Sequence, residues 1–185
     1  MTIEELRQSL PDYARDTKLN LAKVLSAEGA PGLSPTQIKE VALASAYATK
    51  NATVIGAVEG AAVDLSEAEG RAAKAAAAIM AMNNIYYRFT HLVSDKDYQR
   101  LPANLRMNVI GNSGVAKRDF ELMSLAVSAI NGCGLCIDAH VHELVKERAT
   151  KEAVQSAVRI AAVLASAAQV LAIEETAVGV ALAAQ

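Results

Sequence analysis

The chain has 185 residues and a formal net charge of -2 at pH 7; 52% of its residues are hydrophobic and only 4% are aromatic. This length suits one domain, or two small domains that share a core, and the Ala-rich apolar content favours closely packed helices. Lys and Arg form no block, so we expect neither a nucleic acid nor an anionic membrane as a partner.

The first half of the chain predicts five helices. The N-terminal residues 1–20 are charged and lack the apolar core of a signal peptide, so we expect a soluble cytoplasmic protein. Gly29 and Gly32 stand where helices should stop. Capping boxes, in which two residues three apart bond each other's backbone, are expected at Thr2 and Glu5, Ser34 and Gln37, and Ser66 and Glu69. The predicted helices span residues 2–10, 12–26, 35–49, 52–64 and 67–90.

The second half predicts three more helices after an irregular connection at 91–116. Within that connection, "RMNVIG" is the nearest approach to a strand, but it is short and isolated, and a short helix also fits. Gly132 is expected to end one helix and Thr150 to cap another. The apolar last residues, "TAVGVALAAQ", should continue a helix or cover an interface. The predicted helices span residues 117–131, 133–148 and 151–174.

The two halves resemble each other, which suggests a duplicated three-helix unit. Residues 38–60 align with 119–141, so that Glu40 falls on Glu121; a second local match, "AIMAMNN" with "AVSAING", competes with this alignment. Under the preferred alignment, Ala52, Ile55 and Glu59 replace Cys133, Cys136 and His140, and the first half is a scaffold. The expected organisation is N-terminal helices at 1–33, a first repeat at 34–92, a connection at 93–116 and a second repeat at 117–185.

The stretch "NGCGLCIDAHVH" at 131–142 holds both cysteines and two of the three histidines. If Cys133 begins a helix, it shares one helical face with Cys136 and His140. His142 and Asp138 point elsewhere. Thiols near a helix N-terminus are stabilised as thiolates, and a C-x-x-C pair can close a disulfide.

Three interpretations of the cysteines remain open at this point. They can be a redox pair with His140 as proton acceptor or donor, three ligands of a zinc site together with His140, or inert small hydrophobic residues. No second C-x-x-C accompanies them, which weakens the zinc interpretation, and His91 is expected to be structural. Helix position favours Cys133 as the activated thiol, whereas the spacing to His140 favours Cys136.

Glu121 is a candidate partner for His140. It lies inside the apolar run "FELMSLAVSAI", where a buried carboxylate needs a partner. Glu121 lies about 15 Å along the helix before the turn at 131–132, and His140 lies about 10 Å along the helix after that turn. A helical hairpin therefore brings the two residues roughly level. The expected relay runs from Glu121 to His140 to a thiol.

The motif "FELMSLAVSAINGCGLC…AH" closely resembles the active-site motif of the alkyl hydroperoxide reductase D (AhpD) family, in the carboxymuconolactone decarboxylase-like superfamily. The resemblance covers most of the chain and includes "IEELRQSLPDYARDTKLNL", "AIMAMNNIYYR" and "LRMNVIGNSGVAKRDFEL". It implies an all-α fold of repeated helical units, commonly a trimer. It also implies catalytic roles for Glu121, His140, Cys136 and Cys133, with Cys136 forming the sulfenic acid and Cys133 resolving it.

The same resemblance implies a thiol-dependent hydroperoxide reductase with no bound cofactor. Its electrons would come from dihydrolipoamide on a 2-oxoacid dehydrogenase subunit, and it would also reduce a partner peroxiredoxin. Some members carry a histidine between the two cysteines, where this chain has Leu135. The alternatives are a cofactor-free decarboxylase, which has no need of a dithiol, and a redox-regulated binding protein without turnover.

Overall fold

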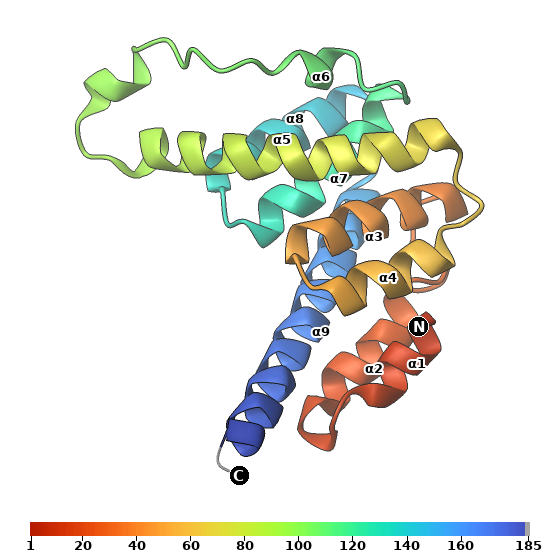
Figure 1. The fold of residues 1–185 in the computed structure, drawn as a ribbon. Coiled ribbons are helices and arrows are strands. Elements are labelled where there is room, and N and C mark those ends of the chain that lie inside the picture. Colours follow the sequence, from red (N-terminus) through yellow and green to blue (C-terminus); the bar gives the residue numbers. More distant parts are fainter. Residues whose placement is uncertain (184–185) are drawn as a thin grey trace.

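The computed structural model describes residues 1–183, with side chains for 1–176, and within this range it contains helices and no strand (Figure 1). The all-α prediction is therefore confirmed. The elements in chain order are α1 (Ile3–Ser9), η1 (Asp12–Ala14), α2 (Arg15–Val24), α3 (Pro35–Thr49), α4 (Ala52–Ala61), α5 (Glu67–Leu92), η2 (Lys96–Gln99), α6 (Asn108–Gly111), α7 (Lys117–Ile130), α8 (Gly134–Lys146) and α9 (Lys151–Ala183).

The predicted start signals sit at the helix N-termini. Both bonds of the capping box form at α1, α3 and α5. At α9, the hydroxyl of Thr150 accepts a hydrogen bond of 3.2 Å from the backbone N–H of Ala153. Such caps typically contribute about 1 kcal/mol each, because they satisfy backbone donors that a helix start leaves without partners.

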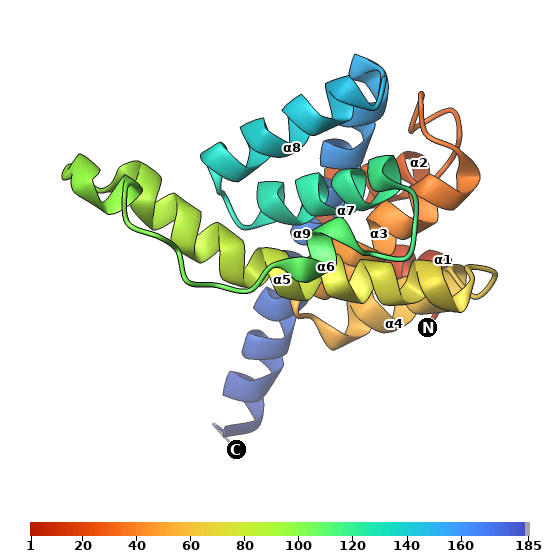
Figure 2. The same ribbon diagram turned by 90° about the horizontal axis from the view of Figure 1, so that it is seen from above.

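Helix α7 forms the centre of the molecule. Every residue from Phe120 to Ser128 is buried, as expected of a helix that is packed on all sides. Helices α3, α5, α8 and α9 pack around it, and the view from above shows α7 enclosed by these neighbours (Figure 2). The side chains of this buried part of α7 are therefore held in place by the surrounding core.

The long helix α9 is apolar enough and long enough to cross a membrane by length and composition alone. In this fold it is a core helix, because Ala157, Ile160 and Leu164 are fully buried against α3 and α7. The helix runs to Ala183, past the predicted end at 174, so the apolar segment that begins at Thr176 continues a helix as far as Ala183, as expected. The side chains of 177–185, and with them any interface they cover, lie outside the described residues.

The helix order repeats along the chain. The series α3–α4–α5 and the series α7–α8–α9 each read helix, helix, long helix, and the capping residues Ser66 and Thr150 precede the two long helices. This is the order expected of a duplicated three-helix unit. The proposed boundaries between the units remain a prediction.

Several predicted helix ends differ from the observed helix ends for local reasons. Helix α2 ends at Val24 rather than 26, because the chain folds back so closely that a Cβ on Gly29 would meet the Lys23 carbonyl oxygen at 1.9 Å. Helix α4 ends at Ala61, since the N–H of Ala62 turns to Glu59. The connection holds η2 and, in place of the strand-like segment, the single turn α6.

Candidate functional site

The two cysteines follow the turn between α7 and α8. Gly132 adopts a φ of 69°, a left-handed conformation that glycine accepts without strain, and it ends α7. Helix α5 anchors this turn: Arg88 Nη1 donates to the Asn131 carbonyl at 2.6 Å, and Asn131 Nδ2 donates to Asn84 Oδ1 at 2.9 Å. These contacts join residues far apart in the sequence, so this anchoring could not be predicted from it.

Cys133 and Cys136 form a disulfide, with their Cα atoms 5.3 Å apart. Cys133 is the N-cap of α8 and not its first residue, which corrects the predicted helix start by one position. Its sulfur accepts a hydrogen bond of 3.3 Å from the backbone N–H of Cys136. Cys133 is fully buried, whereas Cys136 is 7% exposed and lines a cavity, so Cys136 offers the accessible sulfur.

Glu121 and His140 meet, as predicted from the number of residues on each side of the turn. Glu121 Oε2 lies 2.7 Å from His140 Nδ1, and both side chains are buried. Helix α7 supplies the carboxyl group from the core, and α8 supplies the imidazole one turn after Cys136. A hydrogen bond between two buried polar groups fixes the ring orientation of His140 and so determines where its other nitrogen points.

The other ring nitrogen of His140, Nε2, lies 3.3 Å from the thioether sulfur of Met80 on α5. A thioether has no hydrogen to donate, so this contact is a hydrogen bond only in the tautomer that carries a hydrogen on Nε2. In the disulfide form each ring nitrogen of His140 thus has an acceptor beside it, Glu121 at Nδ1 and Met80 at Nε2.

A cavity of about 330 Å³ opens over Cys136 and His140. Its walls come from α5, α8 and the segment around α6, which lie together in the upper part of the molecule in Figure 1. Apart from His140 and Asn83, its lining is mostly apolar, as is usual for sites that take small organic molecules. The lining residues are Met80, Asn83, Tyr87, Met107, Ile110, Leu135, Cys136, Ala139 and His140.

The other residues considered in the sequence lie outside the site around Cys136. His91, Asp138 and His142 are exposed, as expected for residues without a part in the site. Among the described residues, no three His, Cys, Asp or Glu side chains come close enough together to hold a metal ion.

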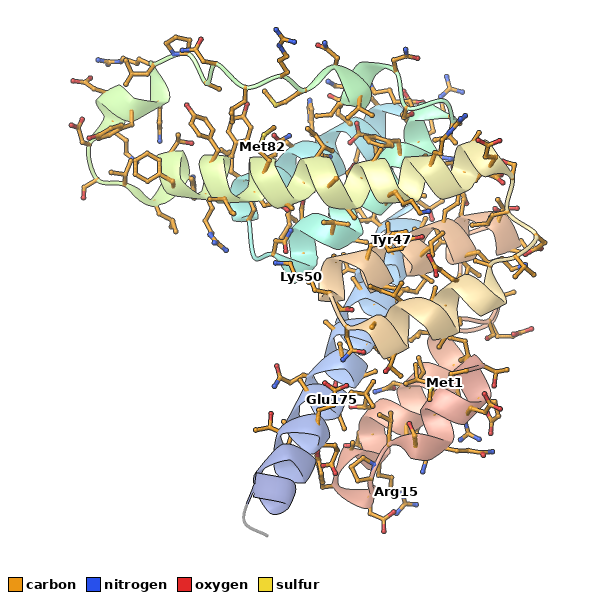
Figure 3. The ribbon with its side chains drawn as sticks, in the orientation of Figure 1. Met1, Arg15, Tyr47, Lys50, Met82 and Glu175 are labelled. Carbon is orange, nitrogen blue, oxygen red and sulfur yellow. A yellow bond between two sulfur atoms is a disulfide. The ribbon has the colours of Figure 1, made fainter. Side chains whose placement is uncertain are left out.

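The first repeat lacks the thiol chemistry at the equivalent position. Ala52 and Ile55 stand where the second repeat has cysteines, and Glu59 accepts a hydrogen bond of 2.8 Å from the hydroxyl of Tyr47. Tyr47 and Lys50, labelled in Figure 3 at the end of α3, line a second cavity of about 520 Å³ that contains neither cysteine.

Glu40 occupies in α3 the place that Glu121 occupies in α7, but it has no imidazole beside it. Its Oε2 is buried without a hydrogen-bond partner among the described residues. Burial, and after it the negative charges of Asp119 and Glu69, raises the pKa of Glu40 to about 8.

Two cavity residues, Met80 and Asn83, were missed as site residues by the sequence analysis. Both lie on α5, far from the C-x-x-C motif in the sequence. A signal was present, because the segments 78–88 and 105–122, which supply part of the cavity wall, are among those that resemble the AhpD family.

Comparisons with known proteins agree with the geometry. The model of the carboxymuconolactone decarboxylase family matches residues 96–178. Alkyl hydroperoxide reductase AhpD of Coxiella burnetii (strain Dugway 5J108-111) is 58% identical over 173 residues, covering 93% of this chain and 98% of that protein. The proteins of the same name from Bradyrhizobium sp. (strain BTAi1 / ATCC BAA-1182) and Rhodospirillum centenum (strain ATCC 51521 / SW) are 53% and 52% identical, covering 100% and 92% of this chain and 100% and 91% of their own lengths.

Proposed function

The chain belongs to the AhpD family, within the carboxymuconolactone decarboxylase superfamily, and from this premise we propose that it is a thiol-dependent alkyl hydroperoxide reductase. The observation that carries the proposal is the Cys133–Cys136 disulfide, whose outer sulfur faces a largely apolar cavity beside the hydrogen-bonded pair of Glu121 and His140. The proposed active residues are Cys136, Cys133, His140 and Glu121.

The oxidative half of the proposed cycle starts from the two thiols. His140 takes the proton of the Cys136 thiol, while Glu121 stabilises the imidazolium that forms. The Cys136 thiolate attacks the terminal oxygen of the hydroperoxide, the O–O bond breaks, and the leaving alkoxide takes the proton from His140. The products are the Cys136 sulfenic acid and an alcohol. The Cys133 thiol then attacks the sulfenic sulfur, which forms the disulfide and releases water.

The reductive half returns two electrons and two protons to the cysteine pair. We propose dihydrolipoamide, carried on a lipoylated 2-oxoacid dehydrogenase subunit, as the donor. Its two thiols become a cyclic disulfide as Cys133 and Cys136 become thiols. The two protons that the donor thiols release pass to the sulfurs of Cys133 and Cys136, and His140, one turn after Cys136, can carry one of them. The resemblance to the family supports this choice of donor, and no bound cofactor is needed.

The reduced cysteine pair would also reduce a partner peroxiredoxin. Cys136 is the sulfur that a partner disulfide can reach, since Cys133 is fully buried. Cys136 would form the mixed disulfide and Cys133 would resolve it. We also propose that the protein acts in the cytoplasm, because thiols are kept reduced there.

We propose that the chain assembles as a homotrimer. Supporting this, Ile85, Phe89 and Leu92 follow helical spacing along α5, and each is at least 48% exposed in the single chain. An exposed apolar row of this kind usually marks an interface.

The test of the proposed function is the consumption of tert-butyl hydroperoxide with dihydrolipoamide as the only reductant, with and without a peroxiredoxin. We expect steady turnover with the chain alone and faster peroxide consumption when the peroxiredoxin is present. Cys136→Ser is the matched control and should show neither. If peroxide oxidises the cysteines once and dihydrolipoamide never restores them, the chain is a redox-regulated protein without turnover.

A further inference from the structure

A further cavity adjoins the one over Cys136. Its volume is about 400 Å³, and it contains neither cysteine. The two cavities share two lining residues, Tyr87 of α5 and Leu135 of α8, which therefore form the wall between them. Leu135 directly precedes Cys136 and is 40% exposed, so this wall stands beside the accessible sulfur.

The two cavities follow one another along one face of α5. The first is lined by Met80, Asn83 and Tyr87, and the adjoining one by Tyr87, Thr90 and His91, at the spacing of three and four residues that repeats on a helix face. From Met80 to His91 the helix rises about 16 Å. In Figure 1 the segment between α5 and α6 runs back along this helix, and it supplies lining residues to both cavities. The cavities thus form one path between α5 and the returning segment.

Hydrogen bonds fix the returning segment to α5 on both sides of the adjoining cavity. At the far end, Gln99 Nε2 donates to the Thr90 carbonyl oxygen at 3.0 Å. Toward Cys136, the Tyr87 hydroxyl donates to the Met107 sulfur at 3.7 Å. The adjoining cavity is therefore formed before any ligand enters, which lowers the cost of ordering that binding requires.

The adjoining cavity suits an uncharged hydrocarbon chain. Two of its polar side chains are engaged within the protein, since the Gln99 amide bonds as described and the Thr90 hydroxyl donates to the Tyr87 carbonyl oxygen at 3.1 Å. Such a lining favours apolar groups, which gain free energy by leaving water. Tyrosines and leucines make up more than half of its lining residues: Tyr86, Tyr87, Tyr98, Leu101 and Leu135.

We propose that the adjoining cavity binds the hydrocarbon tail of an unbranched alkyl hydroperoxide whose reacting end lies at Cys136. This inference rests on the proposed function and names its substrate class, hydroperoxides with a long linear chain. The tail would pass Leu135 and lie against Leu101, where each methylene group that leaves water strengthens binding.

The proposed electron donor is a less suitable occupant. Dihydrolipoamide also has an aliphatic chain, but that chain ends in a polar amide that is attached to a protein. The tail of a linear alkyl hydroperoxide is apolar to its end, which matches the leucine and tyrosine side chains around it.

The test compares n-butyl and n-octyl hydroperoxide, which share the reacting end and differ only in the length of the tail. The measurement is the second-order rate constant for thiol loss from the pre-reduced full chain in a single turnover. For wild type we expect a rate constant with n-octyl hydroperoxide about tenfold or more above that with n-butyl hydroperoxide, the scale for burying a few methylene groups.

Two variants change the adjoining cavity in different ways. Leu101→Gln makes it more polar and Ala103→Phe reduces its volume; neither residue lines the cavity over Cys136. In both we expect the rate constant with n-octyl hydroperoxide to fall about tenfold, because the buried methylene groups lose their place. The rate constant with n-butyl hydroperoxide should stay within about twofold of wild type, as is usual for a substitution away from the reacting groups. Leu19→Gln, at an exposed leucine of α2 outside both cavities, is the matched control and should keep the wild-type ratio.

Each other outcome has one meaning. Equal rate constants with the two hydroperoxides in wild type, or the wild-type ratio in both cavity variants, would overturn the inference and leave the proposed function intact. Equal slowing with both hydroperoxides would show a structural change and also overturn it. Variants that slow only the re-reduction by dihydrolipoamide would assign the cavity to the donor and overturn it as well. If neither hydroperoxide oxidises the wild-type thiols, the proposed function is refuted, and the inference with it.

Discussion

His140 Nε2 lies 3.3 Å from the sulfur of Met80 in the disulfide form, so that His140 has an acceptor on each side of its ring, Met80 on one and Glu121 on the other. Sulfur is a weak acceptor, so the Met80 contact can orient the imidazole without competing strongly for Nε2. Nε2 therefore stays available to the Cys136 thiol once the disulfide opens.

This contact predicts the protonation of one ring atom. Nitrogen-15 NMR of the oxidised protein should show His140 Nε2 carrying a hydrogen, since only a donor can bond to the Met80 sulfur. After reduction, Nε2 should lose the hydrogen as it becomes the acceptor for the Cys136 thiol. The exposed His142 is the internal control and should not respond to the redox state. An Nε2 without hydrogen in the oxidised protein would show that the Met80 contact is not a hydrogen bond.

The buried pair predicts strongly coupled kinetic defects. His140→Phe should slow hydroperoxide turnover by roughly 10²-fold, the usual scale for the loss of a general base, and Glu121→Gln should cause a similar defect. The double variant should be little worse than the more damaged single variant, because members of one relay are not additive. His142→Phe, on the exposed face of α8, should keep the wild-type rate. Simple multiplication of the two single defects would argue against a relay.

The different burial of the two sulfurs predicts different products for the two serine variants. Cys133→Ser should react with one equivalent of hydroperoxide and accumulate a sulfenic acid on Cys136, because no second thiol resolves it. Cys136→Ser should not react, since Cys133 is fully buried. Mass spectrometry after trapping with dimedone distinguishes the two. A dimedone adduct on Cys133 alone would exchange the proposed roles.

The carboxyl group of Glu40 predicts a pH dependence of stability. Its pKa of about 8 in the fold lies above its ordinary 4.5, so the folded state binds the extra proton and stability falls as the pH rises from about 4.5 to about 8. The loss is about 1.4 kcal/mol per unit of the difference, a few kcal/mol in all. Glu40→Gln should therefore raise the free energy of unfolding at pH 8 and change it little at pH 5.

Urea unfolding of wild type and Glu40→Gln across this pH range measures the effect. Glu175→Gln, at an exposed position near the end of the described side chains, is the control for loss of one negative charge (Figure 3). A stability difference between wild type and Glu40→Gln that stays constant from pH 5 to pH 8 would contradict the assignment.

The exposed apolar row on α5 predicts a concentration-dependent assembly. Light scattering should give three times the mass of one chain at micromolar concentration. Ile85→Glu places a charge in the row and should shift the protein toward the monomer, whereas Val145→Glu, on an equally exposed part of α8, should not. A wild-type monomer at this concentration would refute the trimer.

Much of the site could be predicted from the sequence because its parts are local. The disulfide spans one helical turn, and the meeting of Glu121 with His140 follows from counting residues on both sides of one sharp turn. Met80 and Asn83 could not be found in this way, because their place depends on how α5 crosses α8. The Ala-rich sequence of α5 has no strong periodicity to show which face is buried, and Asn83 looks the same as Asn84 until the packing separates them.

Because α7 is enclosed on all sides, Glu121 cannot change position unless the core itself opens. The Glu121 carboxyl group lies in the buried centre of the molecule, whereas the reacting sulfurs lie at the first turn of α8. Heating should therefore leave no state in which the fold persists but the acid has swung away from the imidazole. Inactivation and global melting should occur as one event, and the backbone amide of Glu121 should be among the last to exchange with deuterium.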